Sequence, residues 1–140
     1  MKHIMIDLEM NKIKKQYRED KKLSNELIEI GAVKMDDDFN EVDRYQTYVM
    51  PDYGRMDPHI IKLTGITDDK LEGAPRFKEA MCDFEKWIGG GAVTFYSWSL
   101  ADIRQFQTES SFKEYDSETL RKMEKNWIDF QEEYSRLLGI

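Results

Sequence analysis

The sequence predicts an α/β domain, a β-meander followed by helices, and three observations support this fold class. Short runs rich in β-branched and aromatic residues recur between turns, at residues 4–9, 27–35, 45–49 and 92–96. The segment after Pro75 has apolar residues at helical spacing. The length of 140 residues suits one ordinary domain with a sizeable core. We therefore expect a single domain over residues 1–140.

The composition limits the class of protein. The formal net charge is −7 and the sequence pI is about 4.9, which disfavours a protein that grips nucleic acid by bulk charge. An enzyme that holds phosphates through metal ions tolerates this acidity. No segment has the apolar length of a membrane span or a secretory signal. The single cysteine, Cys82, cannot form an internal disulfide, so we expect a soluble cytoplasmic protein.

The first predicted strand, Ile4 to Glu9, ends on two carboxylates. Side chains alternate across a strand, so Met5, Asp7 and Glu9 share one face. Alternate residues of a strand are about 6.5–7 Å apart, and carboxylates so close repel each other unless they share a cation. A divalent metal is the natural cation, because hard cations take oxygen ligands. The alternative is that both carboxylates are solvated residues at the strand end.

A locally basic stretch follows this strand, from Asn11 to Asn25. Its cations are Lys12, Lys14, Lys15, Arg18, Lys21 and Lys22. The stretch leaves the strand beside the carboxylate pair, where it would be placed to contact a phosphate backbone. It shows no convincing apolar face. Charge runs are usually solvated, and we therefore favour a mobile surface loop.

The middle of the chain completes the meander and begins the helices. Polar residues 36–40 predict a hairpin loop between the second and third strands. Asp57 and Pro58 predict a helix start, with Asp57 as N-cap. The helix after Pro75 ends at Gly89–Gly91, which is not a phosphate cradle because it follows a helix and precedes a strand. The apolar face of this helix comprises Phe77, Ala80, Met81, Phe84, Trp87 and Ile88.

A third acidic residue, Asp102, falls in the first turn of the helix predicted directly after the strand at 92–96. Ser99 and Asp102 resemble a capping box, which is a sufficient structural role. The functional interpretation makes Asp102 a third carboxylate that the sheet brings toward Asp7 and Glu9. Both interpretations stay open from the residues alone. Asp129 precedes Glu132 at the same spacing and is interpreted as the cap of the last helix.

Five segments resemble, in order and spacing, the RNase T/DnaQ-like 3′→5′ exonucleases of the DEDD superfamily, and in particular its DEDDh branch. The resemblance covers essentially the whole chain. It implies an RNase H-like α/β fold, with a mixed sheet whose first three strands form an antiparallel meander flanked by helices. The similar segments are Ile6–Met10 (first motif), Glu26–Val33 (second strand), Leu63–Thr67 (a loop before the long helix), Tyr96–Asp102 (second motif) and Trp127–Phe130.

The resemblance implies a two-metal site. In this family four acidic residues hold two Mg²⁺ or Mn²⁺ ions, which help to generate the attacking hydroxide and stabilise the charge of an in-line displacement. By resemblance, Asp7 bridges both ions, Glu9 binds one ion near the nucleophilic water, and Asp102 serves the second ion. Met10 would lie where the terminal nucleotide docks. Trp98 would support that pocket, against the alternative that it is a core tryptophan.

The chain departs from the family pattern at its end. The third motif should supply a fourth carboxylate and a histidine or tyrosine that positions or deprotonates the water, in a helix beyond Leu138. The chain has two histidines, His3 and His59, and both come far too early. Tyr115 and Tyr134 lack the required spacing to an aspartate. We therefore expect a domain that is incomplete at its C-terminus, impaired in catalysis, and able to self-associate through the uncovered side.

We predict a metal-dependent 3′→5′ exonuclease that hydrolyses phosphodiesters at single-stranded 3′ ends. No residue indicates whether RNA or DNA is preferred. The alternative is a non-catalytic module on the same fold that binds a nucleic-acid end or a protein. A phosphatase with Asp7 as nucleophile is disfavoured, because such sites place a second aspartate where Glu9 stands.

Overall fold

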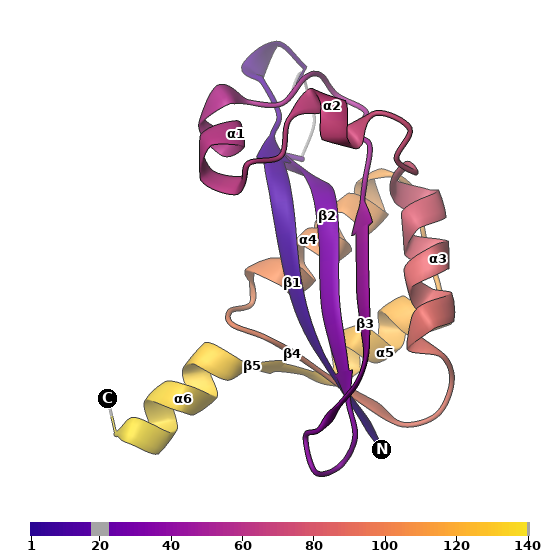
Figure 1. Cartoon of the computed structure of the whole chain (residues 1–140), viewed down its shortest axis with the longest axis vertical. Helices are drawn as coiled ribbons and strands as arrows, with labels where there is room; N and C mark the ends of the chain where they lie inside the picture. The colour runs from indigo at the N-terminus through magenta and orange to yellow at the C-terminus, as the bar shows by residue number, and fades with distance from the viewer. Residues whose placement is uncertain (18–22, 140) are drawn as a thin grey trace.

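The computed structural model describes residues 1–17 and 23–139, and these residues form one five-stranded mixed sheet in the order β3-β2-β1-β4-β5 (Figure 1). The first three strands pair antiparallel as the predicted meander, β4 pairs parallel to β1, and β5 pairs parallel to β4. The predicted α/β fold is confirmed. The strands are β1 (Lys2–Lys12), β2 (Asn25–Met35), β3 (Glu41–Tyr48), β4 (Val93–Ser97) and β5 (Trp127–Asp129).

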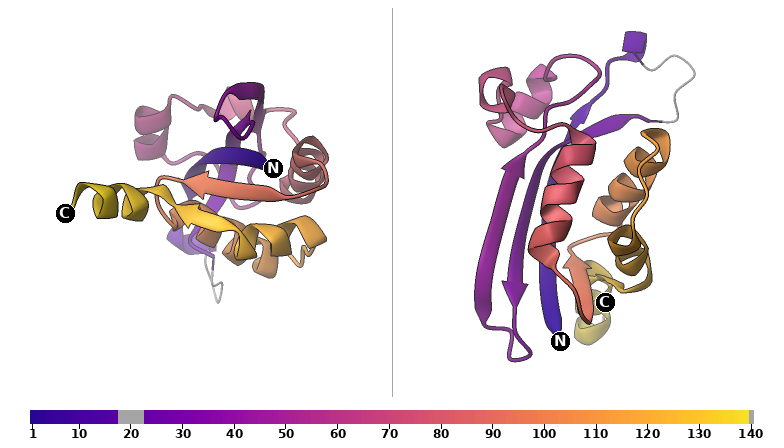
Figure 2. Two further views of the ribbon diagram at one scale, coloured as in Figure 1. Left: turned by 90° about the horizontal axis from the view of Figure 1, so that it is seen from below. Right: turned by 90° about the vertical axis from the view of Figure 1, so that its right-hand side faces the viewer.

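The helices occupy distinct positions around this sheet. Helices α3 and α4 lie on the same side of the meander, α1 and α2 lie over one end of it, and α6 extends away from the body (Figure 2). Within the described residues, no helix has the length and apolarity to span a membrane. The helices are α1 (Pro58–Thr64), α2 (Asp68–Leu71), α3 (Phe77–Ile88), α4 (Ala101–Phe112), α5 (Glu118–Lys125) and α6 (Phe130–Leu138), with a short 3₁₀ helix at Lys15–Tyr17.

The main core lies between the sheet and the helices α3 and α4. Ile4, Ile6 and Leu8 of β1 are buried in it, and the rings of Phe84 and Phe106 stack there with centroids 6.2 Å apart. Full burial of each such side chain is worth about 1.5–3 kcal/mol. The alternate residues of β1 therefore point to the opposite face of the sheet, as the sequence pattern predicts.

A β-bulge interrupts the ladder between β1 and β2. Glu9 pairs with Glu29 but Met10 pairs with Leu27, so Ile28 is an extra residue on β2. Leu27 packs into the main core, whereas Ile28 belongs to a second apolar cluster under α1 and α2. Consecutive residues thus serve two cores. The buried partners of Ile28 are Met56, Ile66 and Leu71.

The first strand and the basic stretch differ from their predicted boundaries. Pairing continues to Lys12, which faces Asn25, so Asp7 and Glu9 lie inside β1 rather than at its end. The prediction that the following segment lacks core residues is wrong, since Ile13 and Leu23 are both buried. The Ile13 N–H bonds the Ser24 carbonyl and brings the two apolar side chains inward together. Lys12, Lys14 and Lys15 are exposed, and Arg18, Lys21 and Lys22 lie outside the described residues.

Candidate active site

Asp7 and Glu9 lie side by side on the face of β1 that points away from α3 and α4. Asp7 is exposed and Glu9 is half-buried, while their neighbours Ile6 and Leu8 are buried on the other face. Antiparallel pairing with β2 fixes this arrangement, because Asp7 lies opposite Gly31 and Glu9 opposite Glu29. The two carboxylates therefore have fixed backbone positions and free outer surfaces.

The end of the parallel ladder brings Asp102 to this pair. The ladder between β1 and β4 ends where Met5 faces Tyr96. Beyond Ser97 the chain leaves the sheet and turns into α4, whose second residue is Asp102. The backbone N–H of Leu8 has no β4 partner, and it lies close enough to the Asp102 carboxylate to lower its pKa. A side chain from the second motif thus takes the place of the missing strand beside Asp7 and Glu9.

Of the two interpretations of Asp102, the capping box with Ser99 is wrong. Leu100 is the N-cap residue and makes no side-chain cap. The Ser99 hydroxyl accepts the Ala101 N–H at 3.2 Å, whereas a capping box would require it to accept the Asp102 N–H. Asp102 instead lies within electrostatic reach of Asp7 and Glu9, and the Leu8 N–H favours its charged form. By contrast, Asp129 caps α6 as predicted, accepting the N–H groups of Gln131 and Glu132.

The three carboxylates influence one another's ionisation. Burial, and then the charges of Asp7 and Glu9, raise the pKa of Asp102 to about 7, against an opposing effect of the Leu8 N–H. Burial also raises the pKa of Glu9, followed by the charges of Asp7 and Glu29. Accumulated negative charge of this kind favours a bound cation, which would relieve the repulsion.

A fourth carboxylate, Glu29, faces the site from β2. It is the direct cross-strand partner of Glu9 and accepts a hydrogen bond from Gln46 Nε2 at 2.8 Å. The sequence pattern does not single out Glu29, although the segment that carries it, Glu26–Val33, resembles the second strand of the family. The register of the β1–β2 pair, which no single segment reveals, is the information that identifies it.

The donor set fits a hard divalent ion in chemistry but is not an assembled cage. No three His, Cys, Asp or Glu side chains within residues 1–17 and 23–139 gather closely enough to enclose a metal. Mg²⁺ and Mn²⁺ take carboxylate oxygens, and Mg²⁺ usually keeps several waters and binds through one or two carboxylates together with substrate phosphates. Asp7, Glu9 and Asp102 offer carboxylate oxygens of this kind, without surrounding the ion.

The two predicted substrate residues lie in different surroundings. Met10 is half-buried, packs against the main core and lines a hollow of about 290 Å³ together with Ser24, Ala101 and Arg104. Met10 directly follows Glu9, and Ala101 directly precedes Asp102. Trp98 is 54% exposed, so it is not a core tryptophan. Its ring lies 6.2 Å from that of Phe130 and 5.9 Å from that of Tyr134, both in α6.

The hydrogen bonds of the two histidines do not involve Asp7, Glu9 or Asp102. His3 lies four residues before Asp7 along β1, and its ring nitrogens contact the Tyr96 hydroxyl at 2.9 Å and the Asp37 carboxylate at 3.2 Å. These bonds tie β1 to the β2–β3 hairpin. His59 is exposed in the first turn of α1, where its N–H donates to the Asp57 cap.

A family comparison decides the class of the protein. The model of the exonuclease family that includes RNase T matches residues 4–137. The chain belongs to this exonuclease family. The match includes all three carboxylates, and the predicted resemblance is confirmed. This exonuclease-family chain is 32% identical over 87 residues to the PolC-type DNA polymerase III of Staphylococcus aureus strain bovine RF122 / ET3-1.

The curated relatives are far longer than this exonuclease-family chain. The PolC-type polymerase of Staphylococcus haemolyticus is 31% identical over 87 residues, and the aligned segment in both polymerases covers 62% of this chain but 5% of the polymerase. The likeness therefore concerns one part of those enzymes.

Solved structures share the fold. The nuclease domain of 3′hExo, a DEDDh family member solved with rAMP, superimposes with a TM-score of 0.83 at 19% identity, over 99% of this chain and 71% of that one. Escherichia coli exonuclease I, solved with a dT13 oligonucleotide, gives a TM-score of 0.62 at 16% identity, over 82% and 24% of the two chains. The RNase H-like exonuclease fold expected from the sequence is confirmed.

Proposed function

We propose that this chain is a metal-dependent 3′→5′ exonuclease domain that acts on the 3′ ends of single-stranded nucleic acid. The observation that carries the proposal is the position of Asp102. The second motif delivers its carboxylate to the Leu8 N–H, within electrostatic reach of Asp7 and Glu9 from the first motif. A purely structural cap would have no reason to lie there.

Each carboxylate has a proposed role. Asp7, exposed at the centre of the site, would bridge two Mg²⁺ or Mn²⁺ ions, and Glu9 would hold one of them beside the attacking water. Asp102 would serve the second ion, largely through its water shell. Bound ions of this kind supply a water of lowered pKa and neutralise charge in an in-line displacement at phosphorus. The chain's own contribution is to fix Asp7 and Glu9 on a strand paired with β2 and to bring Asp102 to them at the start of α4.

The proposed substrate is a single strand whose terminal nucleotide docks against Met10. The hollow beside Met10 lies between the start of β2 and α4, and it is lined by Met10 and Ala101, the sequence neighbours of Glu9 and Asp102. Trp98, exposed beside α6, offers a ring for base stacking. One structural neighbour is described with rAMP and another with dT13, which supports both RNA and DNA as substrates to be tested.

We propose that catalysis is weak unless another group supplies a proton acceptor. His3 is engaged by Tyr96 and Asp37, and His59 is at the start of α1, so neither is placed to accept a proton from water at Asp7. The second candidate function, a non-catalytic module that binds a nucleic-acid end or a protein, follows from this arrangement. The single exposed cysteine, Cys82, supports a reducing compartment, and we propose the cytoplasm.

The test is release of mononucleotides from a 3′-labelled single strand with Mg²⁺ or Mn²⁺. The proposal expects slow release that EDTA abolishes and that Asp7→Asn and Asp102→Asn each reduce. Asp83→Asn is the matched control, because Asp83 is an exposed carboxylate of α3 bonded to Tyr45. Release that is equal in all variants would indicate a contaminating nuclease. Strand binding without release would favour the non-catalytic module.

A further inference from the structure

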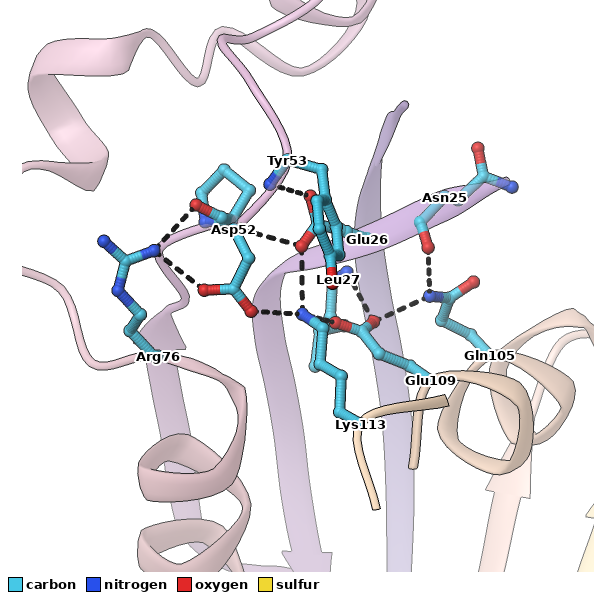
Figure 3. Close-up of polar contacts among 10 residues, drawn as sticks. Asn25, Glu26, Leu27, Asp52, Tyr53, Arg76, Gln105, Glu109 and Lys113 are labelled. Carbon is cyan, nitrogen blue, oxygen red and sulfur yellow. Dashed lines mark hydrogen bonds and ion pairs between the residues drawn. The ribbon is translucent and has the colours of Figure 1, made fainter. Parts of the chain in front are cut away.

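A buried ionic cluster joins α4 to the beginning of β2. Lys113 Nζ lies 2.9 Å from a Glu26 oxygen and 2.7 Å from Glu109 Oε2, and the side chains of both glutamates are fully buried (Figure 3). Lys113 also contacts Asp52 at 2.9 Å. Burial opposes the charge of Lys113, but Glu109 and Glu26 outweigh it and raise the pKa of the ammonium. Lys113 therefore remains charged at neutral pH.

Stability alone is a weak explanation for such a cluster. Taking charges out of water costs several kcal/mol per ion, and hydrophobic replacements of buried ion pairs are often neutral or stabilising. The best-attested role of buried polar groups is to fix one register among alternatives. The position of the cluster beside the β1–β2 bulge agrees with that role.

Glu109 makes the contacts that meet the bulge. Its Oε1 accepts the backbone N–H of Leu27 at 2.8 Å and the Gln105 amide at 2.8 Å (Figure 3). The same amide donates to the Asn25 carbonyl at 3.0 Å. Leu27 is the residue at which pairing resumes after the extra Ile28. A buried backbone N–H left without a partner costs about 1–3 kcal/mol, so the Glu109 carboxylate stabilises the shifted register.

The same helix links this bulge to the other half of the site. Glu109 follows Asp102 by two turns of α4, which is about 10 Å along a helix. On β1, the register shift falls between Glu9 and Met10. Glu109 thus hydrogen-bonds beside the bulge that determines the register of Glu9 and Met10. It also belongs to α4, the helix that carries Asp102. β-Bulges beside active sites often aim a side chain in this way.

We propose that Glu109 is a positioning residue for the carboxylate site, holding the β1–β2 register beside Glu9 and the seating of α4 that presents Asp102. The inference rests on the proposed function in its choice of metal readout. It assigns Glu109 no contact with substrate or metal. Its predicted effect passes through the Leu27 N–H.

Two substitutions separate this route from the loss of charge. Glu109→Gln and Glu109→Leu remove the same charge, but the glutamine oxygen still accepts the Leu27 N–H. Glu85→Leu is the control, because the half-buried Glu85 accepts hydrogen bonds from the hydroxyls of Tyr115 and Ser117, which belong to neither β1 nor β2. If Glu109→Leu does not fold by circular dichroism, Glu109→Asp replaces it, since the shorter side chain retracts from Leu27 while keeping its charge.

The measurements are Mn²⁺ titration by calorimetry and backbone amide NMR of the full chain. We expect Glu109→Leu to weaken Mn²⁺ binding about 10- to 100-fold, the usual range for groups that orient metal ligands, and Glu109→Gln to stay within about threefold of wild type. The amide signals of Glu9, Met10 and Leu27 should shift in Glu109→Leu and not in Glu85→Leu.

Each remaining outcome has a defined meaning. Equal Mn²⁺ affinity in wild type and folded Glu109→Leu overturns the inference and leaves the proposed function standing. Equal loss in Glu109→Gln and Glu109→Leu overturns the route through Leu27. Absence of Mn²⁺ binding in wild type overturns the proposed function instead. The amide shifts then decide the inference alone, and unchanged Glu9 and Met10 signals in Glu109→Leu overturn it.

Discussion

Glu9 and Glu29 face each other directly across the β1–β2 ladder, one carboxylate on each strand. Burial, and then the charges of Asp7 and Glu29, raise the pKa of Glu9. The sheet therefore maintains a repulsion that a cross-strand pair of opposite charge would not have. Native proteins accept such local costs mainly at functional sites.

Glu29→Gln should stabilise the metal-free protein. The substitution removes the repulsion with Glu9 and keeps an oxygen for the Gln46 amide, and like-charge cross-strand pairs cost about 0.2–1 kcal/mol. Urea unfolding at pH 7 in EDTA measures the gain. Glu41→Gln, on the exposed start of β3 beside Arg44, is the control and should give no gain. A loss of stability in Glu29→Gln would contradict the electrostatic account.

The stability of the metal-free protein should fall as the pH rises from about 4 to about 7. The folded-state pKa of Asp102 is raised to about 7 from an ordinary value of 3.8, so in this window the folded state keeps a proton that the unfolded state has lost. After allowance for the solvent that reaches this half-buried carboxyl, we expect roughly 1–2 kcal/mol. Urea unfolding at pH 5 and pH 8, in wild type and Asp102→Asn, measures it. The variant should lose this part of the slope.

Mn²⁺ or Mg²⁺ should stabilise the folded protein at pH 8. Ligands that bind the folded state add about 2.7 kcal/mol at 100 times their Kd. Thermal unfolding should therefore shift upward with added Mn²⁺, and EDTA should reverse the shift. Asp7→Asn should abolish most of the shift, whereas Asp83→Asn should retain it. Equal shifts in both variants would place the bound metal elsewhere.

Trp98→Ala should weaken the binding of a single strand. Base stacking on an aromatic side chain contributes about 1–3 kcal/mol per base, and Trp98 is exposed beside α6. Fluorescence anisotropy of a 5′-labelled strand with phosphorothioate linkages at its 3′ end measures affinity without hydrolysis. Phe39→Ala, an exposed aromatic at the β2–β3 hairpin, is the control. Similar losses in both variants would show that Trp98 has no special role.

Leu137→Asp should reduce any self-association of the chain. Helix α6 has Phe130, Tyr134, Leu137 and Leu138 exposed, and Leu137 is 81% exposed. Exposed apolar patches of this kind favour association. Sedimentation velocity over a range of concentrations measures the oligomeric state, with Gln131→Glu as a control on the same helix. A wild-type chain that stays monomeric at high concentration would exclude this prediction.

Local pattern sufficed for the elements that interact with their own neighbours. The alternation in β1, the Asp57 cap and the apolar face of α3 follow from residues within one or two turns of each other, and all three occur in the structure. The placement of Asp102 at a strand-to-helix junction was also predictable. Its partner was not, because the Leu8 N–H becomes available only where β4 leaves β1.

The remaining features depend on contacts between distant segments. Glu109 and Leu27, whose N–H it accepts, are 82 residues apart in the chain, and no local pattern predicts their contact. The bulge at Ile28 depends on two competing cores. Strand β5 has three residues, too few for a periodic signal. In the sequence, Glu26 and Glu109 have no feature that distinguishes them from surface charges. Only the fold buries them and places Lys113 between them.

The central place of β1 has a consequence for the order of folding. Its antiparallel partner β2 is close in sequence, so the hairpin can form early, whereas the parallel ladder pairs His3 with Thr94 and must wait for a long loop to close. Asp102 arrives only with that second event. We therefore expect the nascent chain to form the meander first, with Glu9 already opposite Glu29, and to add the carboxylate of Asp102 last.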